Sequence, residues 1–205
     1  MTGGRGRPGG DHGDNSGAAD AGARSLALPL TPEDAKSLRA GDRVLLCGPL
    51  YTARDAAHAR MADTLASGGQ LPVDLAGQLI YYSGPTPAPP GRVIGSAGPT
   101  TSARMDAWTP PLLQLGLSGA VGKGERSAET RHAFRLHGAV YFLATGGAGA
   151  LLARCVKTAE VVAYEDLGTE AVRRLVVHDF PVVVAWDAHG GDLFTTARKT
   201  EQRSS

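Results

Sequence analysis

The sequence predicts a single layered α/β domain, and three observations support this fold class. Short apolar runs typical of strands alternate along the chain with segments of helical periodicity. The 205 residues, 42% of them apolar, suffice for one sizeable core with a tail but scarcely for two domains. No repeat at solenoid periods is evident in the sequence. We therefore divide the chain into a tail over 1–25, a domain over 26–198 and a flexible C-terminus over 199–205.

The tail is rich in Gly, Asp, Arg and Ala and has no periodic apolar positions. Such a segment cannot offset the entropy lost on ordering, so we predict that it is disordered. The ordered part begins with Leu26, Leu28 and Leu30, whose alternation is typical of a strand. Thr31 is the expected N-cap of a short helix that has a proline at its first position.

The rest of the domain continues the alternation. A compact apolar run over 42–48 predicts a strand, and Ala57, Met61 and Leu65 share one face of a helix that stops at a Gly-Gly pair. The later predicted elements are, in order, a strand within 77–85, a helix ending near 112–115, a strand and tight loop over 116–124, an amphipathic helix over 127–138, a buried strand over 139–145, a loop and helical turn over 146–156, and two strands around a short helix over 161–194.

Composition argues against several classes of function. The net charge of +1, from 21 basic and 20 acidic residues, is too small to favour nucleic acid or an anionic membrane as a partner. No apolar run approaches the roughly 20 residues of a membrane span, and the first stretch has no apolar signal region, so we expect a cytoplasmic protein.

Cys47 and Cys155 have apolar neighbours and no metal-ligand spacing, which predicts inert core residues and no metal site in this chain.

Two segments carry side chains suited to anion binding. Residues 98–106 place Thr100, two further hydroxyls and Arg104 after a Gly-Pro turn, a set that can bind one carboxylate at the start of a helix. Taken alone, this segment is more typical of a helix N-cap beside an exposed arginine. Lys123 lies between two glycines, which let the backbone approach a ligand closely, although a turn with a solvated lysine has the same pattern.

The cations are more informative as a set. Arg54, Arg104 and Lys123 each follow a predicted strand, and strand ends in an α/β sheet gather on one edge. Three cations at such an edge suit a dicarboxylate. The histidines show no paired metal-ligand spacing, so we expect them to be core or surface residues.

Several segments together resemble a known family. They are, in chain order, YTARDAAHARM, YYSGPTPAPPGRVIGSAGPTTSARMD, GLSGAVGKG, YFLATGGAGALL and EDLGTEAVRRLVVHDFPVVVAWDAHGGDLF. These segments are similar to the β-subunit, or C-terminal region, of class I fumarate hydratases and L-tartrate dehydratases, which are iron-sulfur hydro-lyases. The resemblance extends from about Leu26 to Phe194, and the N-terminal tail lies outside the family pattern.

The resemblance implies a swivelling β/β/α domain that works with a cluster-bearing α-subunit. In that family the partner, and not this chain, holds a 4Fe-4S cluster whose open iron acts as a Lewis acid toward the substrate hydroxyl. It further implies that Thr100 is the catalytic base, that Arg54 and Arg104 bind substrate carboxylates, and that Lys123 is an active-site lysine with catalytic and substrate-binding roles. Thr100 is an awkward base because its hydroxyl is weakly acidic, so a purely hydrogen-bonding role stays open.

Three functions remain open from the sequence. The first is reversible hydration of fumarate to (S)-malate by a complex of this chain with its α-subunit. The second is the same chemistry on L-tartrate, since three cations do not distinguish two dicarboxylates. The third is a non-catalytic anion-binding module that lost its cluster partner. The family also implies a heterodimer repeated by two-fold symmetry, the commonest form of closed assembly.

Overall fold

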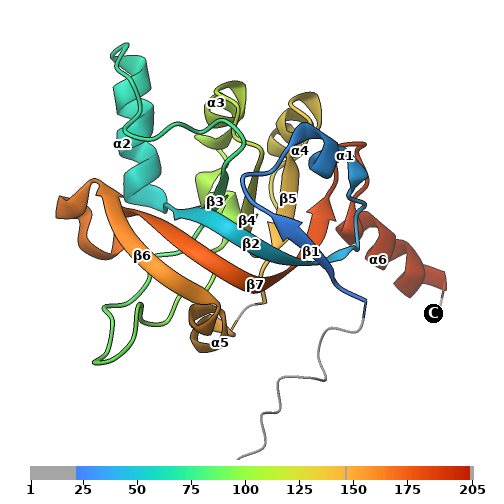
Figure 1. The fold of residues 1–205 in the computed structure, drawn as a ribbon. Coiled ribbons are helices and arrows are strands. Elements are labelled where there is room, and N and C mark those ends of the chain that lie inside the picture. The colour runs from blue at the N-terminus through green and yellow to red at the C-terminus, as the bar shows by residue number, and fades with distance from the viewer. Residues whose placement is uncertain (1–21, 146, 204–205) are drawn as a thin grey trace, which may run out of the picture.

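A seven-stranded sheet that closes on itself forms the centre of the computed structural model, which describes residues 22–145 and 147–203, the last five by their backbone alone (Figure 1). The strand order is β1-β2-β3-β4-β5-β7-β6, and an extra pairing of β2 with β7 joins five of these strands into a ring. The chain is therefore a mixed α/β domain with a barrel-like sheet. The strands are β1 (Arg24–Ala27), β2 (Arg43–Thr52), β3 (Leu79–Tyr81), β4 (Gly119–Gly122), β5 (Val140–Leu143), β6 (Val156–Ala163) and β7 (Val172–Trp186).

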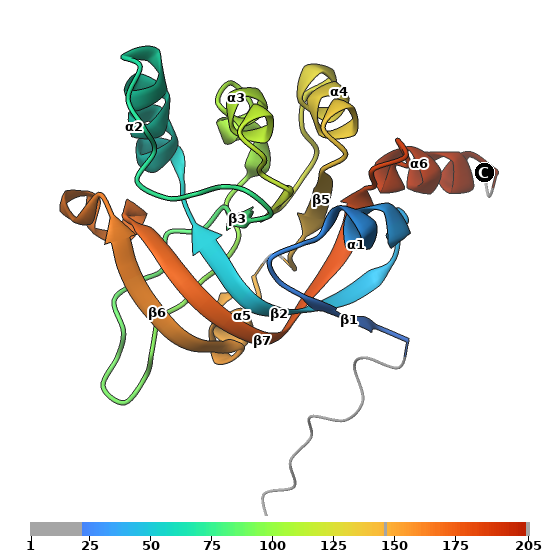
Figure 2. The same cartoon turned by 45° about the horizontal axis from the view of Figure 1, so that its top comes forward.

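The helices lie around this sheet, with α2, α3 and α4 side by side over one face and α5 on the opposite side (Figures 1 and 2). The α-helices are α1 (Pro32–Ser37), α2 (Asp55–Ala66), α3 (Thr109–Gln114), α4 (Ala128–Leu136), α5 (Gly149–Arg154) and α6 (Leu193–Arg203). Two 3₁₀ segments complete the fold, η1 (Ser102–Met105) and η2 (Glu165–Glu170).

Strand direction determines which loops meet. Strands β2, β3, β4 and β5 run parallel to one another in that order, whereas β7 is antiparallel to β2, β5 and β6. The carboxyl ends of β2, β3 and β4 consequently lie on the same edge of the sheet, and the segments that follow these ends gather there.

Alternation along the central strands produces two apolar cores. Tyr81, Val121 and Phe142 point to one face of the sheet and belong to the core enclosed by the ring. Their neighbours Ala120 and Tyr141 point to the other face, into a core shared with buried side chains of α2, α3 and α4. Because successive strand residues face opposite sides, strands buried on both faces read as continuous apolar runs.

Several local predictions are confirmed. Thr31 caps α1, since its side chain accepts a hydrogen bond from the Asp34 N–H, and Pro32 is the first helical residue. The predicted helix over 127–138 is α4, and its N-cap Ser127 accepts from the Thr130 N–H at 3.1 Å. Each cap satisfies a backbone donor that the helix itself leaves unpaired.

The ends of the domain differ from the prediction. Strand β1 begins at Arg24, inside the segment predicted as tail, and it ends at Ala27, so Leu28 and Leu30 follow the strand instead of continuing it. Both leucines are nevertheless buried in the core. Helix α6 runs through Arg203 and therefore covers most of the predicted flexible C-terminus. The predicted disorder over 1–21 lies outside the described residues.

Within the described part of the chain, no helix is long and apolar enough to cross a membrane.

Candidate functional site

The carboxyl edge of β2, β3 and β4 carries the predicted site residues. Arg54 is the N-cap of α2 and follows the end of β2, as predicted. Lys123 follows β4 directly, also as predicted. Arg104 departs from the prediction, because it lies within η1 at the end of a long loop and not directly after a strand. That loop returns to the sheet, so Arg104 still reaches the same edge.

One carboxylate joins the two arginines. Arg104 Nε donates to Asp55 Oδ1 at 2.8 Å, and Arg54 Nη2 lies 3.5 Å from Asp55 Oδ2. Arg54 also pairs with Glu170 of η2 at 3.7 Å. Asp55 was not singled out from the sequence, since an acidic residue in the first turn of a helix is an ordinary partner of the helix dipole. The fold gives it a second role, which is to hold two guanidinium groups side by side.

The two arginines differ in how accessible their unpaired donor atoms are. The Nε atom of Arg54 is buried and has no hydrogen-bond partner among the described residues. The Arg104 side chain is 53% exposed and uses only its Nε within the described chain. Arg104 can therefore donate to an anion at the surface, whereas the unpaired Arg54 Nε is enclosed by the protein.

Thr100 and Lys123 meet through the backbone. The Thr100 N–H donates to the Tyr82 carbonyl at the end of β3, and Thr101 forms a parallel bridge with Lys123. Ser102 completes the junction, because its N–H donates to the Lys123 carbonyl and its Oγ accepts from the Lys123 N–H at 3.1 Å. Thr100 is thereby fixed between the ends of β3 and β4.

A close contact with Ser102 requires a glycine at position 122, directly before Lys123. A Cβ at this position would lie 1.9 Å from Ser102 Oγ, closer than any real contact. The sequence predicted that these glycines admit a ligand to the backbone, whereas the close neighbour of Gly122 is η1. The absence of a side chain therefore lets η1 dock against the end of β4.

A buried ion pair supports this edge from beneath. The Arg126 side chain is fully buried, and its Nε donates to Asp106 Oδ1 at 2.7 Å. The other Asp106 oxygen accepts from the Ser127 N–H, which ties the end of η1 to the start of α4. Arg126 also lies over the rings of Tyr82 and Tyr141. This pair was not predictable from the sequence, since each residue alone is typical of an ordinary surface charge.

His58 anchors the Arg54 backbone. Its Nδ1 lies 2.9 Å from the Arg54 carbonyl, and its Nε2 is buried without a hydrogen-bond partner among the described residues. The pKa of His58 is lowered to about 4, and burial is the largest cause of this shift. The backbone hydrogen bond to Arg54 acts in the opposite direction. His58 is therefore neutral at neutral pH, and Nδ1 donates to the carbonyl.

This shift predicts a pH dependence of stability. The His58 pKa is about 6.5 when the chain is unfolded and about 4 when it is folded, so protons bind the unfolded state preferentially between these values. His58 should lower the free energy of unfolding by about 2 kcal/mol between about pH 7.5 and about pH 5. Urea unfolding of the wild type and His58→Asn at both pH values measures this contribution. Equal pH dependence in the two proteins would contradict it.

The prediction of inert core residues holds only in part, since Cys155 packs against the core but neither cysteine is fully buried. Cys47 and Cys155 are half-buried, and each has its sulfur near Asp179 instead of near the carboxyl edge. Neither belongs to the group formed by Arg54, Arg104, Thr100 and Lys123.

Comparison with known proteins agrees with the resemblance seen in the sequence, except that the match begins inside the tail that we placed outside the family pattern. Residues 12–197 match the model of the family described as "Fumarase C-terminus". A relative from Methanocaldococcus jannaschii, named "Putative L(+)-tartrate dehydratase subunit beta", is 42% identical over 176 residues, which are 83% of this chain and 90% of the relative.

Two fumarate hydratases are also similar. "Fumarate hydratase class I, aerobic" of Escherichia coli is 37% identical over 161 residues, 78% of this chain and 29% of the relative. "Fumarate hydratase 2" of Leishmania major is 38% identical over 157 residues, 76% of this chain and 28% of the relative. The chain thus spans under a third of these two enzymes but nearly all of the M. jannaschii protein. On this combined agreement of sequence, family model and relatives, the chain belongs to the fumarase C-terminus family.

Proposed function

We propose that this chain is the β-subunit of a hydro-lyase that reversibly hydrates fumarate to (S)-malate. The observation that supports the proposal is the carboxyl edge, where Asp55 pairs with both Arg54 and Arg104 and where the backbone of Thr101, next to Thr100, bridges to Lys123. Guanidinium groups bind carboxylates through paired hydrogen bonds, and a C4 dicarboxylate offers two such groups. The names of the E. coli and L. major relatives support this substrate.

The proposed chemistry gives each of these residues a role, and Arg104 takes two. Arg54 and Arg104 bind the substrate carboxylates, and Asp55 keeps their planes in place. In the dehydration direction, Thr100 Oγ as an alkoxide accepts the proton from the carbon next to the hydroxyl-bearing carbon, and the C–H electron pair becomes the double bond as hydroxide departs from the neighbouring carbon. The Lys123 ammonium and Arg104 lower the energy of the alkoxide electrostatically.

The exposure of the site supports the need for a partner. Arg104 and Lys123 are exposed, so this chain alone does not exclude water from them. The two cysteines are too few for the usual thiolate set of an iron-sulfur cluster, and they lie beside Asp179 and not at this edge. We therefore propose that the 4Fe-4S cluster belongs to an α-subunit. The roles proposed above for the residues of this chain do not include binding the cluster.

L-Tartrate is the second candidate substrate. It is favoured by the M. jannaschii relative, whose name gives tartrate and whose length matches this chain. The cytoplasmic location and the swivelling layered arrangement implied by the family also remain proposals.

An anaerobic assay of this chain co-purified with its cluster-bearing partner tests the function. Fumarate, malate and tartrate are supplied separately, and the ultraviolet absorbance of the unsaturated product or substrate is followed. Turnover of fumarate and malate by the complex, and by neither subunit alone, is the expected result. Turnover of tartrate alone would transfer the same roles to the second substrate. An intact complex without turnover of any of the three would overturn the hydro-lyase proposal in favour of an anion-binding module.

Substitution of Arg104 tests the carboxylate-binding role. Arg104→Ala is expected to lower kcat/KM of the complex by about 10- to 100-fold, because hydrogen bonds to charged groups contribute about 1.5–3 kcal/mol. Arg60→Ala is the matched control, since Arg60 lies on the exposed side of α2 and pairs with Asp166. The assigned role is wrong if both variants retain wild-type kcat/KM.

A further inference from the structure

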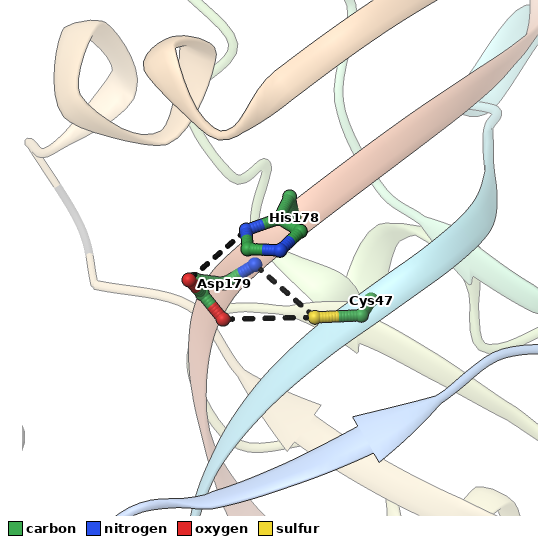
Figure 3. A group of neighbouring side chains, drawn as sticks. All are labelled: Cys47, His178 and Asp179. Atoms are coloured by element: carbon green, nitrogen blue, oxygen red, sulfur yellow. Dashed lines mark hydrogen bonds and ion pairs between the residues drawn. The ribbon is translucent and has the colours of Figure 1, made fainter.

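A second group of polar side chains lies where β2 pairs with β7 (Figure 3). Cys47, His178 and Asp179 each place a ligand atom so that all of these atoms lie within 4.8 Å of one another. Cys47 belongs to the middle of β2, whereas Arg54 follows its carboxyl end. The group is therefore separate from the edge that carries the proposed substrate site.

A β-bulge produces this arrangement. Leu46 pairs with Phe180 and Gly48 pairs with Val177, so Cys47 alone faces two residues of β7, His178 and Asp179. Adjacent residues of a regular strand point to opposite faces. Here Asp179 has a positive φ of 53°, and its carboxylate turns back toward its neighbour. The His178 Nδ1 to Asp179 Oδ2 distance is consequently only 3.0 Å.

The cysteine sulfur is held at the centre of the bulge. The Cys47 thiol donates to Asp179 Oδ1 at 3.6 Å, and the Cys47 sulfur accepts from the Asp179 N–H at 3.3 Å. Figure 3 shows His178 and Cys47 on two sides of the same carboxylate. A thiol, an imidazole and a carboxylate from two different strands are thus fixed around one point.

We propose that Cys47, His178 and Asp179 bind a thiophilic divalent cation, with Zn²⁺ as the best match. Zinc takes Cys sulfur at about 2.3 Å and His nitrogen or carboxylate oxygen at about 2.0–2.2 Å, which in a tetrahedron separates the ligand atoms by about 3.3–3.6 Å. The sulfur-to-oxygen distance of 3.6 Å already has this value. Harder ions such as Mg²⁺ and Ca²⁺ prefer sites made of oxygen alone.

Binding leaves one coordination position for water and releases one proton. The Cys47 S–H bond breaks as the sulfur-to-metal bond forms, and the proton passes to solvent. The His178 and Asp179 side chains are exposed, so the ion and its water have access from the surface. Because the ligands come from β2 and β7, the ion would clamp the pairing that closes the sheet.

Zinc titration of the tag-free full-length chain, by calorimetry and by competition with a chromogenic chelator, tests the proposal. We expect one equivalent of Zn²⁺ to bind, with Mg²⁺ unable to compete. Cobalt should give a thiolate-to-metal charge-transfer absorption, which identifies a sulfur ligand. Cys47→Ser and His178→Ala should each weaken zinc binding by about 100-fold or more. Mutation of a residue that only supports a metal ligand costs about 10–100-fold, so a larger loss identifies a ligand.

Matched variants make the test specific. Cys155→Ser removes the other cysteine, whose sulfur lies 3.4 Å from the Asp179 carbonyl, and His132→Ala removes an exposed histidine of α4; both should bind zinc like the wild type. Asp179→Asn should weaken zinc binding without straining the backbone, because asparagine also tolerates a positive φ. Circular dichroism of every variant checks the fold. Stoichiometric zinc binding that survives both Cys47→Ser and His178→Ala, or no binding by the folded wild type, would overturn the proposal.

Discussion

Thr100→Ala in the complex with the α-subunit is expected to lower kcat by about 10²- to 10⁴-fold, the usual contribution of a positioned general base. KM should change less, because Arg54 and Arg104 retain the carboxylate contacts. The Thr100 backbone is held by the Tyr82 carbonyl, so truncation of the side chain leaves the segment in place. Steady-state kinetics of the anaerobic complex on malate measures both constants.

Two neighbouring variants separate a base from a hydrogen-bonding group. Thr100→Ser keeps the hydroxyl and should retain most of the activity. Thr101→Ala removes the exposed hydroxyl of the next residue. It keeps the backbone pairing between Thr101 and Lys123 and should leave kcat unchanged. If Thr100→Ala instead raises KM and spares kcat, Thr100 only binds the substrate, and the proton acceptor is another group.

Asp106→Ala is expected to lower the free energy of unfolding by about 3–5 kcal/mol, the usual cost of removing one partner of a buried ion pair. The variant would leave the fully buried Arg126 without its counter-charge and the Ser127 N–H without its acceptor. Burial lowers the pKa of Arg126, but the nearby Tyr82 and Asp106 raise it overall, so the native guanidinium is charged and depends on this counter-charge. Urea unfolding followed by circular dichroism gives this energy.

An exposed pair supplies the control for Asp106. Glu125→Ala breaks the contact between Arg198 and Glu125, both more than half exposed, and should cost no more than about 1 kcal/mol. The double variant Asp106→Ala/Arg126→Met should recover part of the lost stability, since it removes the unpaired charge as well. Equal losses in the Asp106 and Glu125 variants would show that burial does not determine the strength of these pairs.

Local features of the fold were predictable because each depends on neighbouring residues. The Thr31 cap, the one-sided apolar pattern of α2 and the buried run of β5 follow from periodicity and from side-chain preference. The closure of the sheet was not predictable in this way. It depends on β2 pairing with β7, and the same apolar strands would equally suit an open layered sheet.

The candidate site was predictable in composition and less so in position. Arg54 and Lys123 follow strands, so the rule that strand ends share an edge applies to them. Arg104 reaches that edge through a loop whose path the sequence does not encode locally. Cys47 and Asp179 are 132 residues apart, and motif spacing cannot detect a group formed by two paired strands so distant in the sequence.

The double pairing of β7 also has a consequence for the order of assembly during synthesis. Strand β7 supplies hydrogen bonds to β2 and to β5, yet its residues 172–186 leave the ribosome after both of those strands. Until then, β2 and β5 each expose a row of unpaired backbone groups to other chains. The nascent domain is therefore most vulnerable to aggregation just before its last strand emerges, and the ring can close only once translation of that strand is complete.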